Sequence, residues 1–344
     1  MKIVVFGPEK RTGVLRDDKV VDISYAFSKY LRERQNERHP RTLADALVPS
    51  DLARFVDGGK TTIENAQKAI DHLFGGVQNQ LGPRGEQLIF AANAVKLHAP
   101  RPNNARVACA GGNFADHAMA MMARTQPAGA PKPTMEQARE NVRKNGIWGF
   151  WKIHRDLVGQ DGEIIYPGKT DRLDYEGEIA IILAKTGKDI KPNEIKDYVW
   201  GVTMLGDWSI RRYAEPNMPL KFAMVKNFDT SCSLGPCIAV GEGDALDTVV
   251  ETYVNGERRQ RHSTKEMVFS FGEYLEYLSR DLTLYSGDIV SGGTGAGTAA
   301  DSSPPGPNGE QTNDRFLKPG DTVEMRSPDI GVLRAKIVAK PAAR

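Results

Sequence analysis

The second part of the chain is divided into short apolar segments, which are separated by turns containing Gly and Pro. Segments of this length suit strands, which usually contain about 3–10 residues. Their spacing predicts a mostly antiparallel β architecture that carries a few helices. The predicted strands are Ile164–Tyr166, Ile179–Leu183, Val199–Leu205, Cys237–Val240, Val249–Val254, Asp288–Val290, Thr322–Met325 and Gly331–Val338.

One of these strands begins with a pair of carboxylates. Glu176 and Glu178 lie one residue apart and lead directly into Ile179–Leu183. Because successive strand side chains alternate between faces, both glutamates point the same way. Two ionised carboxylates at the edge of a core repel each other unless a positive group lies between them. A hard divalent cation such as Mg²⁺ would satisfy both, and a solvated strand end is the alternative that this pattern leaves open.

The composition excludes several classes of protein. The chain has 46 Lys and Arg against 44 Asp and Glu, so its formal net charge of +2 gives no basic excess that would indicate a nucleic-acid partner. No apolar run approaches the roughly 18 residues that a membrane span needs. Met1–Gly7 is too short for a secretory signal and is expected to form a first strand. The three cysteines are too few and too scattered for a disulfide framework, so a cytoplasmic location is expected.

The amino-terminal region differs in character from the rest. It is expected to form a short meander followed by helices, and a Pro-punctuated linker at Lys96–Pro102 separates it from the strand-rich remainder of the chain. We therefore expect a small N-terminal domain with its linker over residues 1–100 and a catalytic domain over residues 101–344. The elements expected in the first are strands Lys2–Phe6, Thr12–Leu15 and Val20–Ile23 and helices Ala26–Arg34 and Ile63–Leu73.

A long insertion comes after the strand expected at Arg106–Ala110. Short helices are expected over Asp116–Met122 and Met135–Lys144, and prolines between Pro127 and Pro133 interrupt them. Long insertions between strands are often lids over active sites. We expect this one to be a lid.

Two further residues have the chemistry of a site. Asp207 ends the apolar run Gly201–Asp207 and could supply a third oxygen ligand, or it could cap a helix that begins at Trp208. Lys226 lies within the apolar segment Phe222–Phe228, where a lysine either extends to the surface or, if buried, acts as an electrophile near bound anions. The local pattern leaves both choices open.

Taken in order, these pieces resemble the fumarylacetoacetate hydrolase family over nearly the whole chain. The resemblance implies an α+β, β-rich fold, in which a catalytic domain of mixed β-sandwich or β-roll type follows a small N-terminal α/β domain. The motifs that carry it are Gly111–His117, Asp174–Glu178, Asp207 with Arg211, Lys226–Pro236, Val254–Glu257, Gly287–Asp288, Gly293–Thr294 and Phe316–Asp321.

The resemblance also implies roles for particular residues. Glu176, Glu178 and Asp207 would bind Mg²⁺ (or Mn²⁺), and a small 2-oxo or 1,3-dicarbonyl carboxylate substrate would chelate this ion through its oxygens. Lys226 would be catalytic, and His117 on the lid would be the general base. The substrate would also contact Arg211, Gly293 and Thr294. Family members usually form homodimers, and no nucleic-acid or membrane partner is implied.

The chain departs from the family pattern around the substrate. In many members a glutamate follows the lid histidine by three residues and forms a dyad with it, but Ala120 stands here. Glu136 or Glu140 on the second lid helix could replace that glutamate, or both could lie on an ordinary exposed face. Ala214 replaces a common glutamine, and Gly295 replaces a proline.

These departures leave the reaction open. The family's namesake activity favours a Mg²⁺-dependent hydrolase that cleaves a C–C bond in an acylpyruvate-like substrate, as in the breakdown of aromatic compounds. Decarboxylation, tautomerisation, isomerisation or hydration of a 2-oxo acid are alternatives, and binding of metal and dicarboxylate without turnover is another. A nucleotide site at Gly292–Gly297 is rejected because it lacks the lysine of a phosphate-binding loop.

Overall fold

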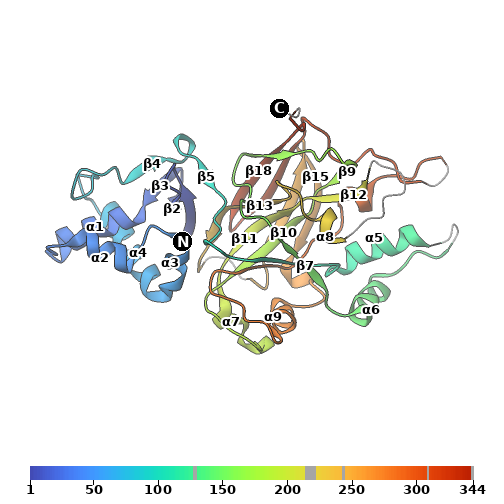
Figure 1. Ribbon diagram of the computed structural model, residues 1–344, viewed down its shortest axis with the longest axis horizontal. Coiled ribbons are helices and arrows are strands. Elements are labelled where there is room, and N and C mark those ends of the chain that lie inside the picture. Colours follow the sequence, from blue (N-terminus) through green and yellow to red (C-terminus); the bar gives the residue numbers. More distant parts are fainter. Residues whose placement is uncertain (127–129, 214–221, 242–244, 308–309, 342–344) are drawn as a thin grey trace.

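The computed structural model describes residues 1–126, 130–213, 222–241, 245–307 and 310–341. An N-terminal lobe and a larger body lie side by side along the long axis of the molecule (Figure 1). The lobe packs helices against a small meander of strands. Its elements are β1 (Lys2–Phe6), β2 (Arg11–Arg16), β3 (Lys19–Asp22), α1 (Ile23–Arg34), α2 (Pro40–Leu47), α3 (Leu52–Asp57), α4 (Gly59–Phe74), β4 (Ile89–Ala91) and β5 (Leu97–His98).

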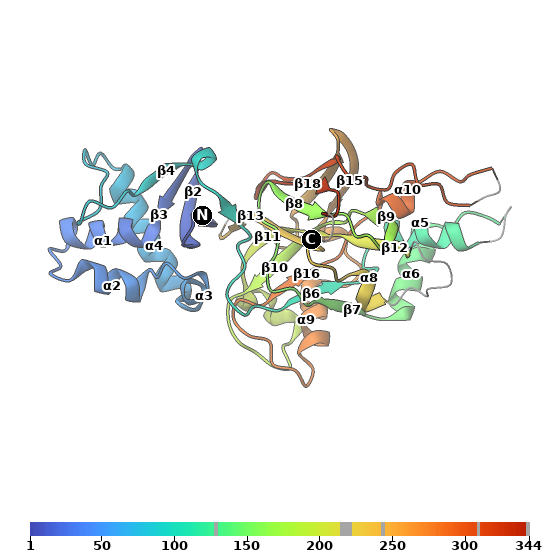
Figure 2. The ribbon, with the colours of Figure 1, turned by 45° about the horizontal axis from the view of Figure 1, so that its top comes forward.

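The body is rich in strands, and α5 and α6 extend from the end that lies away from the lobe (Figures 1 and 2). Its helices are α5 (Ala115–Thr125), α6 (Met135–Asn145), α7 (Ile195–Tyr198), α8 (Phe222–Val225), α9 (Phe271–Ser279) and α10 (Ala299–Ser302). Its strands are β6 (Val107–Ala110), β7 (Gly149–Lys152), β8 (Gly162–Ile165), β9 (Thr170–Asp174), β10 (Gly177–Leu183), β11 (Val199–Asp207), β12 (Ser209–Tyr213), β13 (Cys232–Ala239), β14 (Val249–Val254), β15 (Glu257–Ser263), β16 (Ile289–Ser291), β17 (Thr322–Ser327) and β18 (Gly331–Val338).

A single large sheet runs through both parts of the molecule. Its eleven strands are ordered β4-β3-β2-β1-β13-β11-β10-β16-β6-β7, and β5 pairs with β1. The lobe joins the body where β1 pairs antiparallel with β13, with Ile3 opposite Ile238. The Met1 ammonium extends this edge by donating to the Val240 carbonyl at 2.7 Å. The expected linker therefore contributes a strand of its own, β5, and the division into two domains stays a prediction.

A five-stranded sheet, ordered β15-β14-β17-β18-β8, packs on one face of the large sheet. Alternate residues of β10 point to opposite faces of the large sheet, because successive side chains of a strand alternate in direction. Ile179 and Ile181 belong to the core that contains β14, β17 and β18, whereas Ala180 and Ile182 belong to the core on the other face. Gly177 allows the sheets to approach closely, because a Cβ there would lie 2.1 Å from the Thr252 hydroxyl.

The predicted fold class is confirmed, and the predicted strands Val249–Val254 and Gly331–Val338 have the same bounds as β14 and β18. The helix considered after Asp207 is wrong. Residues Ser209–Tyr213 form β12, which pairs with β9 in a separate two-stranded sheet. Among the described residues, no helix has both the length and the apolar character needed to cross a membrane.

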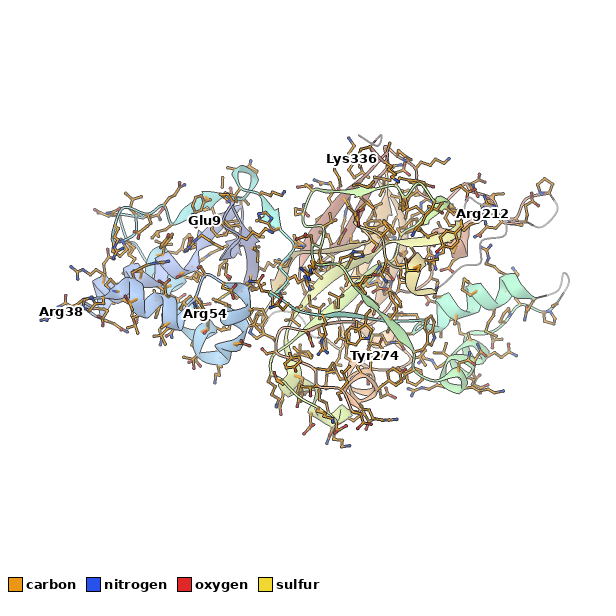
Figure 3. The ribbon with its side chains drawn as sticks, viewed as in Figure 1. Glu9, Arg38, Arg54, Arg212, Tyr274 and Lys336 are labelled. Carbon is orange, nitrogen blue, oxygen red and sulfur yellow. The ribbon has the colours of Figure 1, made fainter. Side chains whose placement is uncertain are left out.

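Side chains fill the body around its strands (Figure 3). Tyr274, labelled in Figure 3 on α9, is buried and donates its hydroxyl to the Cys109 carbonyl on β6 at 2.8 Å. This bond fixes α9 against the strand that leads into the lid. α6 begins with a capping box, in which the Thr134 hydroxyl accepts from the Gln137 amide and the Gln137 side chain accepts from the Thr134 amide.

Candidate active site

The register between β10 and β11 brings three carboxylates together. Gly177 lies opposite Gly206, and the Asp207 amide donates to the Glu176 carbonyl at 2.9 Å, so Asp207 lies across from Glu176. Glu178 follows two residues later on the same face. One oxygen from each of the three carboxylates lies within 4.8 Å of the others, and all three residues are buried. We call Glu176, Glu178 and Asp207 the acidic triad.

Lys226 lies against the acidic triad and does not extend to solvent. It is 3% exposed. Its ammonium contacts the Glu176 carboxylate and donates to Asp207 Oδ2 and to the Ser209 hydroxyl, both at 2.7 Å. Of the two choices left open by the sequence, the structure therefore selects the buried lysine.

A second buried lysine, Lys152, was missed by the sequence analysis. Its ammonium contacts the other oxygen of Asp207 and donates to the carbonyls of Lys226 at 2.6 Å and Ser231 at 2.9 Å. It ends β7, a strand that was not predicted. No motif marks it, because its role depends on long-range contacts of its side chain with Asp207 and with the carbonyls of Lys226 and Ser231.

Asp174 connects the predicted arginine to the loop that carries α10. Arg211 Nε donates to Asp174 Oδ2 at 2.9 Å, and the Arg211 guanidinium also contacts Glu176. Asp174 additionally accepts from the backbone amides of Ala299 at 2.6 Å and Ala300 at 3.1 Å, which begin α10. A fully buried carboxylate thus fixes the orientation of the arginine and the start of the helix together.

The charges of the acidic triad are unevenly compensated. Burial, together with the nearby charges of Asp207 and Glu176, raises the pKa of Glu178 well above its usual value. Burial also acts to raise the pKa of Glu176, but Arg211 and Lys226 outweigh it and hold that pKa well below the usual value. Burial raises the pKa of Asp207 despite the two lysines. Glu178 is therefore the member with the least positive charge beside it.

The residues present suit a divalent cation. Three converging carboxylates are the hard oxygen donors that Mg²⁺ and Mn²⁺ prefer. The repulsion that raises the pKa of Glu178 is the kind that a bound cation relieves. Lys226 already contacts Glu176 and Asp207, so a bound ion would share those two carboxylates with its ammonium.

His117 has a carboxylate partner that the sequence analysis did not find. Its Nδ1 lies 2.8 Å from Asp301 Oδ2, and the Asp301 side chain is 3% exposed. Burial opposes protonation of His117, but Asp301 and the charge of Glu176 outweigh this effect and raise the pKa of the imidazole. Asp301 lies on α10, within the Gly-, Ser- and Pro-rich stretch, 184 positions after His117.

The residues considered as replacements for the missing glutamate do not serve that purpose. Glu136 and Glu140 are both exposed on α6, which agrees with the alternative that they belong to an ordinary exposed helix face. Ala120 lies on α5 and leaves the position beside His117 to Asp301. Ala214, where the family often has glutamine, lies outside the described residues.

Thr294 and Gly293 lie where the glycine-rich turn meets the acidic triad. The Thr294 hydroxyl donates to the Gly177 carbonyl and accepts from Gln260 Nε2, each at 2.9 Å. These bonds hold the turn against β10 and occupy the hydroxyl that was expected to contact substrate. Gly293 has φ +88°, and a Cβ there would lie 3.0 Å from the Ala110 carbonyl, so the turn requires glycine.

Several of these groups line one cavity of about 330 Å³. Its strand side presents Glu176, Glu178, Lys226, Arg211 and Thr294, and its lid side presents residues of α5 and α6 and the chain leading into β7. His117 lies on the lid side, on α5. The cavity therefore brings Glu176 and Glu178 of the triad to the same space as His117.

The fold and the site define a β-rich enzyme with a buried carboxylate triad under a helical lid. A family model described as Fumarylacetoacetate (FAA) hydrolase C-terminal matches residues 106–338. The chain belongs to this family, whose members include tautomerases, isomerases and hydrolases.

Relatives and solved structures match nearly the whole chain. Oxaloacetate tautomerase YisK of Bacillus subtilis (strain 168) is 30% identical over 329 residues, which cover 94% of each chain. The mitochondrial oxaloacetate tautomerase FAHD2A of Homo sapiens is 28% identical over 296 residues, covering 86% of this chain and 82% of that one.

Among solved structures, the maleylpyruvate hydrolase of Sphingobium sp. SYK-6, in complex with manganese(II) and pyruvate, has a TM-score of 0.65 at 20% identity, covering 99% of this chain and 100% of that one. At this identity the likeness concerns the fold. The expected homodimer and cytoplasmic location stay predictions.

Proposed function

We propose that this protein is a metal-dependent tautomerase that interconverts the keto and enol forms of a 2-oxo carboxylate. The observation that carries the proposal is the His117–Asp301 pair, whose histidine lines the same cavity as Glu176 and Glu178 of the acidic triad. Tautomerisation needs one group that moves a proton and an environment that stabilises an enolate. Both requirements are met within this cavity.

His117 is suited to move the proton. Its Nδ1–H donates to Asp301, which leaves Nε2 as the basic atom for substrate. In the keto-to-enol direction, Nε2 takes a proton from the carbon next to the carbonyl, the electron pair of that C–H bond forms the C=C bond, and the same proton is then delivered to the carbonyl oxygen. No other reactant is needed, because the proton that leaves carbon arrives on oxygen.

The strand side of the cavity would stabilise the negative charge of the enolate. Lys226 is a buried cation there and Arg211 is a partly buried one, and the salt bridges of Arg211 to Asp174 and Glu176 fix its orientation. A divalent ion held by Glu176, Glu178 and Asp207 would supply a Lewis acid for the adjacent carboxylate and keto oxygens of the substrate. These residues would therefore orient the substrate with the carbon next to its carbonyl toward the lid.

Tautomerisation is favoured over the hydrolysis expected from the family name for two reasons. Relatives that match most of the chain are named oxaloacetate tautomerases. In addition, His117 is the one histidine among the described residues that line the cavity, and proton transfer between carbon and oxygen needs a single base.

C–C hydrolysis of an acylpyruvate remains the second candidate, and one observation favours it. Activation of water by a histidine benefits from a carboxylate partner, and Asp301 supplies one. Hydrolysis would consume the acylpyruvate irreversibly, whereas tautomerisation only speeds its approach to equilibrium.

The two candidates are separated by following ultraviolet absorbance with the Mn²⁺-loaded protein. We expect faster relaxation of freshly dissolved oxaloacetate toward its keto–enol equilibrium, and no loss of total acylpyruvate. His117→Gln should abolish the acceleration. Acylpyruvate consumption would favour the hydrolase, and tight dicarboxylate binding without either reaction would indicate a binding protein.

A further inference from the structure

The lid side of the cavity differs chemically from the strand side. Its described side chains are mostly apolar and come from three parts of the chain: Met121 and Met122 on α5, Val142 on α6, and Trp148 and Phe150 at and before β7. A substrate whose carboxylate and keto oxygens face the acidic triad would direct its far end toward these groups.

The position of Trp148 is built into the backbone. A Cβ on Gly111 would lie 2.4 Å from the Trp148 ring, so the ring packs directly on the chain at the end of β6. The residue is 42% exposed, and Met121 on α5 is 40% exposed. The two therefore form an aromatic and a thioether wall at the mouth of the cavity.

The described residues on the lid side of the cavity carry little positive charge. Among the described residues that line the cavity, the cationic groups are Lys226, Arg211 and, when protonated, His117. Each is already paired: Lys226 with Glu176 and Asp207, Arg211 with Asp174 and Glu176, and His117 with Asp301.

The other polar groups on the lid side carry no net charge. Asn141 and Asn145 are neutral amides on α6, which ends at Asn145. The cations of its last turn, Arg143 and Lys144, are not among the residues that line the cavity. A second carboxylate at the far end of the substrate would therefore find neutral amide donors but no unpaired cation among the described residues of the lining.

We propose that the preferred substrate is a 2-oxo carboxylate whose far end is uncharged and apolar, and that Met121 and Trp148 determine this preference. The inference rests on the proposed function, since it assigns the polar end of the substrate to the acidic triad. Each methylene buried in an apolar pocket typically changes kcat/KM by about 10-fold or more, so a phenyl tail provides a sensitive probe.

Two substrates test the inference. Keto–enol exchange of phenylpyruvate and of oxaloacetate is followed by ultraviolet absorbance with the Mn²⁺-loaded full-length protein. We expect kcat/KM to be at least about 10-fold higher for phenylpyruvate. A preference for oxaloacetate by the unmodified protein would overturn the inference.

Matched variants assign the preference to residues. Met121→Arg adds a cation at the lid side and should lower the ratio of phenylpyruvate to oxaloacetate kcat/KM by at least about 10-fold, and Trp148→Ala should lower it as well. Met135→Arg makes the same change on α6, at a residue that is 47% exposed and outside the described lining, and should leave the ratio unaltered. Equal ratios in Met121→Arg and Met135→Arg would contradict the assignment.

Two further measurements keep this inference separate from the proposed function. If neither substrate is turned over, equilibrium binding to the Mn²⁺-loaded protein still ranks them. Tighter phenylpyruvate binding without turnover would overturn the proposed function and support the tail preference, whereas equal or weaker binding would overturn the inference. Light scattering of Met121→Arg is expected to show an unchanged oligomeric state. A changed state would mean that Met121 lies in a contact between subunits, and it would overturn the proposal.

Discussion

The two sides of the cavity are built in different ways. On the strand side, the carboxylates lie on neighbouring strands of a large sheet, and the Glu176–Glu178 spacing fixes their common direction. On the lid side, His117 lies on a helix of an insertion, and its partner Asp301 comes from a short helix late in the chain. One side depends on local spacing, and the other depends on a long-range contact.

The difference concerns what each side contributes. A sheet holds charged groups rigidly, which suits a group of carboxylates that must keep its geometry around a cation. A base carried on a lid acquires its partner only where the lid contacts the body. The structure has several such contacts, including one in which the Asp116 side chain on α5 accepts from the Ala296 amide at 3.1 Å.

The largest expected effect is on the strand side. Glu178→Gln removes a charge from the acidic triad without changing its shape, and we expect divalent-ion binding and turnover to become undetectable. Calorimetry with Mn²⁺ measures the binding, and circular dichroism checks the fold. Glu136→Gln, at an exposed position of α6, is the matched control and should bind Mn²⁺ normally. Normal Mn²⁺ affinity in Glu178→Gln would remove the triad as the metal site.

The next effect is on the lid side. Asp301→Asn should lower kcat by about 100-fold or more while sparing Mn²⁺ binding, because His117 loses the carboxylate that orients and charges it. Since Asp301 raises the pKa of His117, its loss lowers that pKa, and the acidic limb of the kcat profile should move to lower pH.

Other charged groups near His117 also affect its pKa, but the Asp301→Asn variant leaves them in place. These groups are Glu176, Arg211 and His262, and all three are unchanged in the variant. Asp301→Glu should restore part of the rate. An unaltered kcat and profile in Asp301→Asn would show that the pair has no part in the reaction.

A smaller effect tests the lysine that supports the strand side. Lys152→Met leaves Asp207 with one buried cation in place of two, and we expect the free energy of unfolding to fall by about 3 kcal/mol. Urea denaturation provides the measurement. Lys185→Met removes the exposed pair with Asp197 and should cost less than about 1 kcal/mol. An equal loss of unfolding free energy in the two variants would mean that the buried Lys152–Asp207 pair contributes no more to stability than the exposed pair.

The smallest expected effect lies behind the lid. Burial lowers the pKa of His262 to about 3, and its ring packs edge-on against Phe114 at 4.8 Å, directly before α5. The unfolded chain binds a proton near pH 6.5 and the folded chain does not, so stability falls as the pH drops below 6.5. Between pH 7.5 and pH 5 the loss should be about 2 kcal/mol. In urea denaturation, the stability of His262→Leu should depend less on pH than that of the unmodified protein. An unchanged pH dependence would show that His262 is not its cause.

The sequence indicates the strand side well because its signals are local. An i, i+2 glutamate pair before an apolar run predicts both the strand and the shared face, and the apolar segments predict β14 and β18 with their bounds. The helix considered after Asp207 is wrong because Ser209–Tyr213 pairs with β9, a partner that local propensity does not report.

The lid side could be predicted only in part. The two lid helices and His117 follow from the sequence, but the partner of His117 does not. Asp301 lies in a stretch whose composition is typical of a loop, and its function depends on Asp174 holding the first amides of α10 in place. Lys152 could not be predicted for a similar reason, since a lysine at a strand end usually faces water.

The pairing of β1 with β13 has a practical consequence for work with this protein. All eight residues of β13 are buried, and β1 covers one of its edges. A variant that is shortened from its amino end would expose that edge as a row of unpaired backbone groups, which is a template for association between chains. Deleting the N-terminal lobe should therefore cause aggregation, and affinity tags are better placed at the carboxyl end.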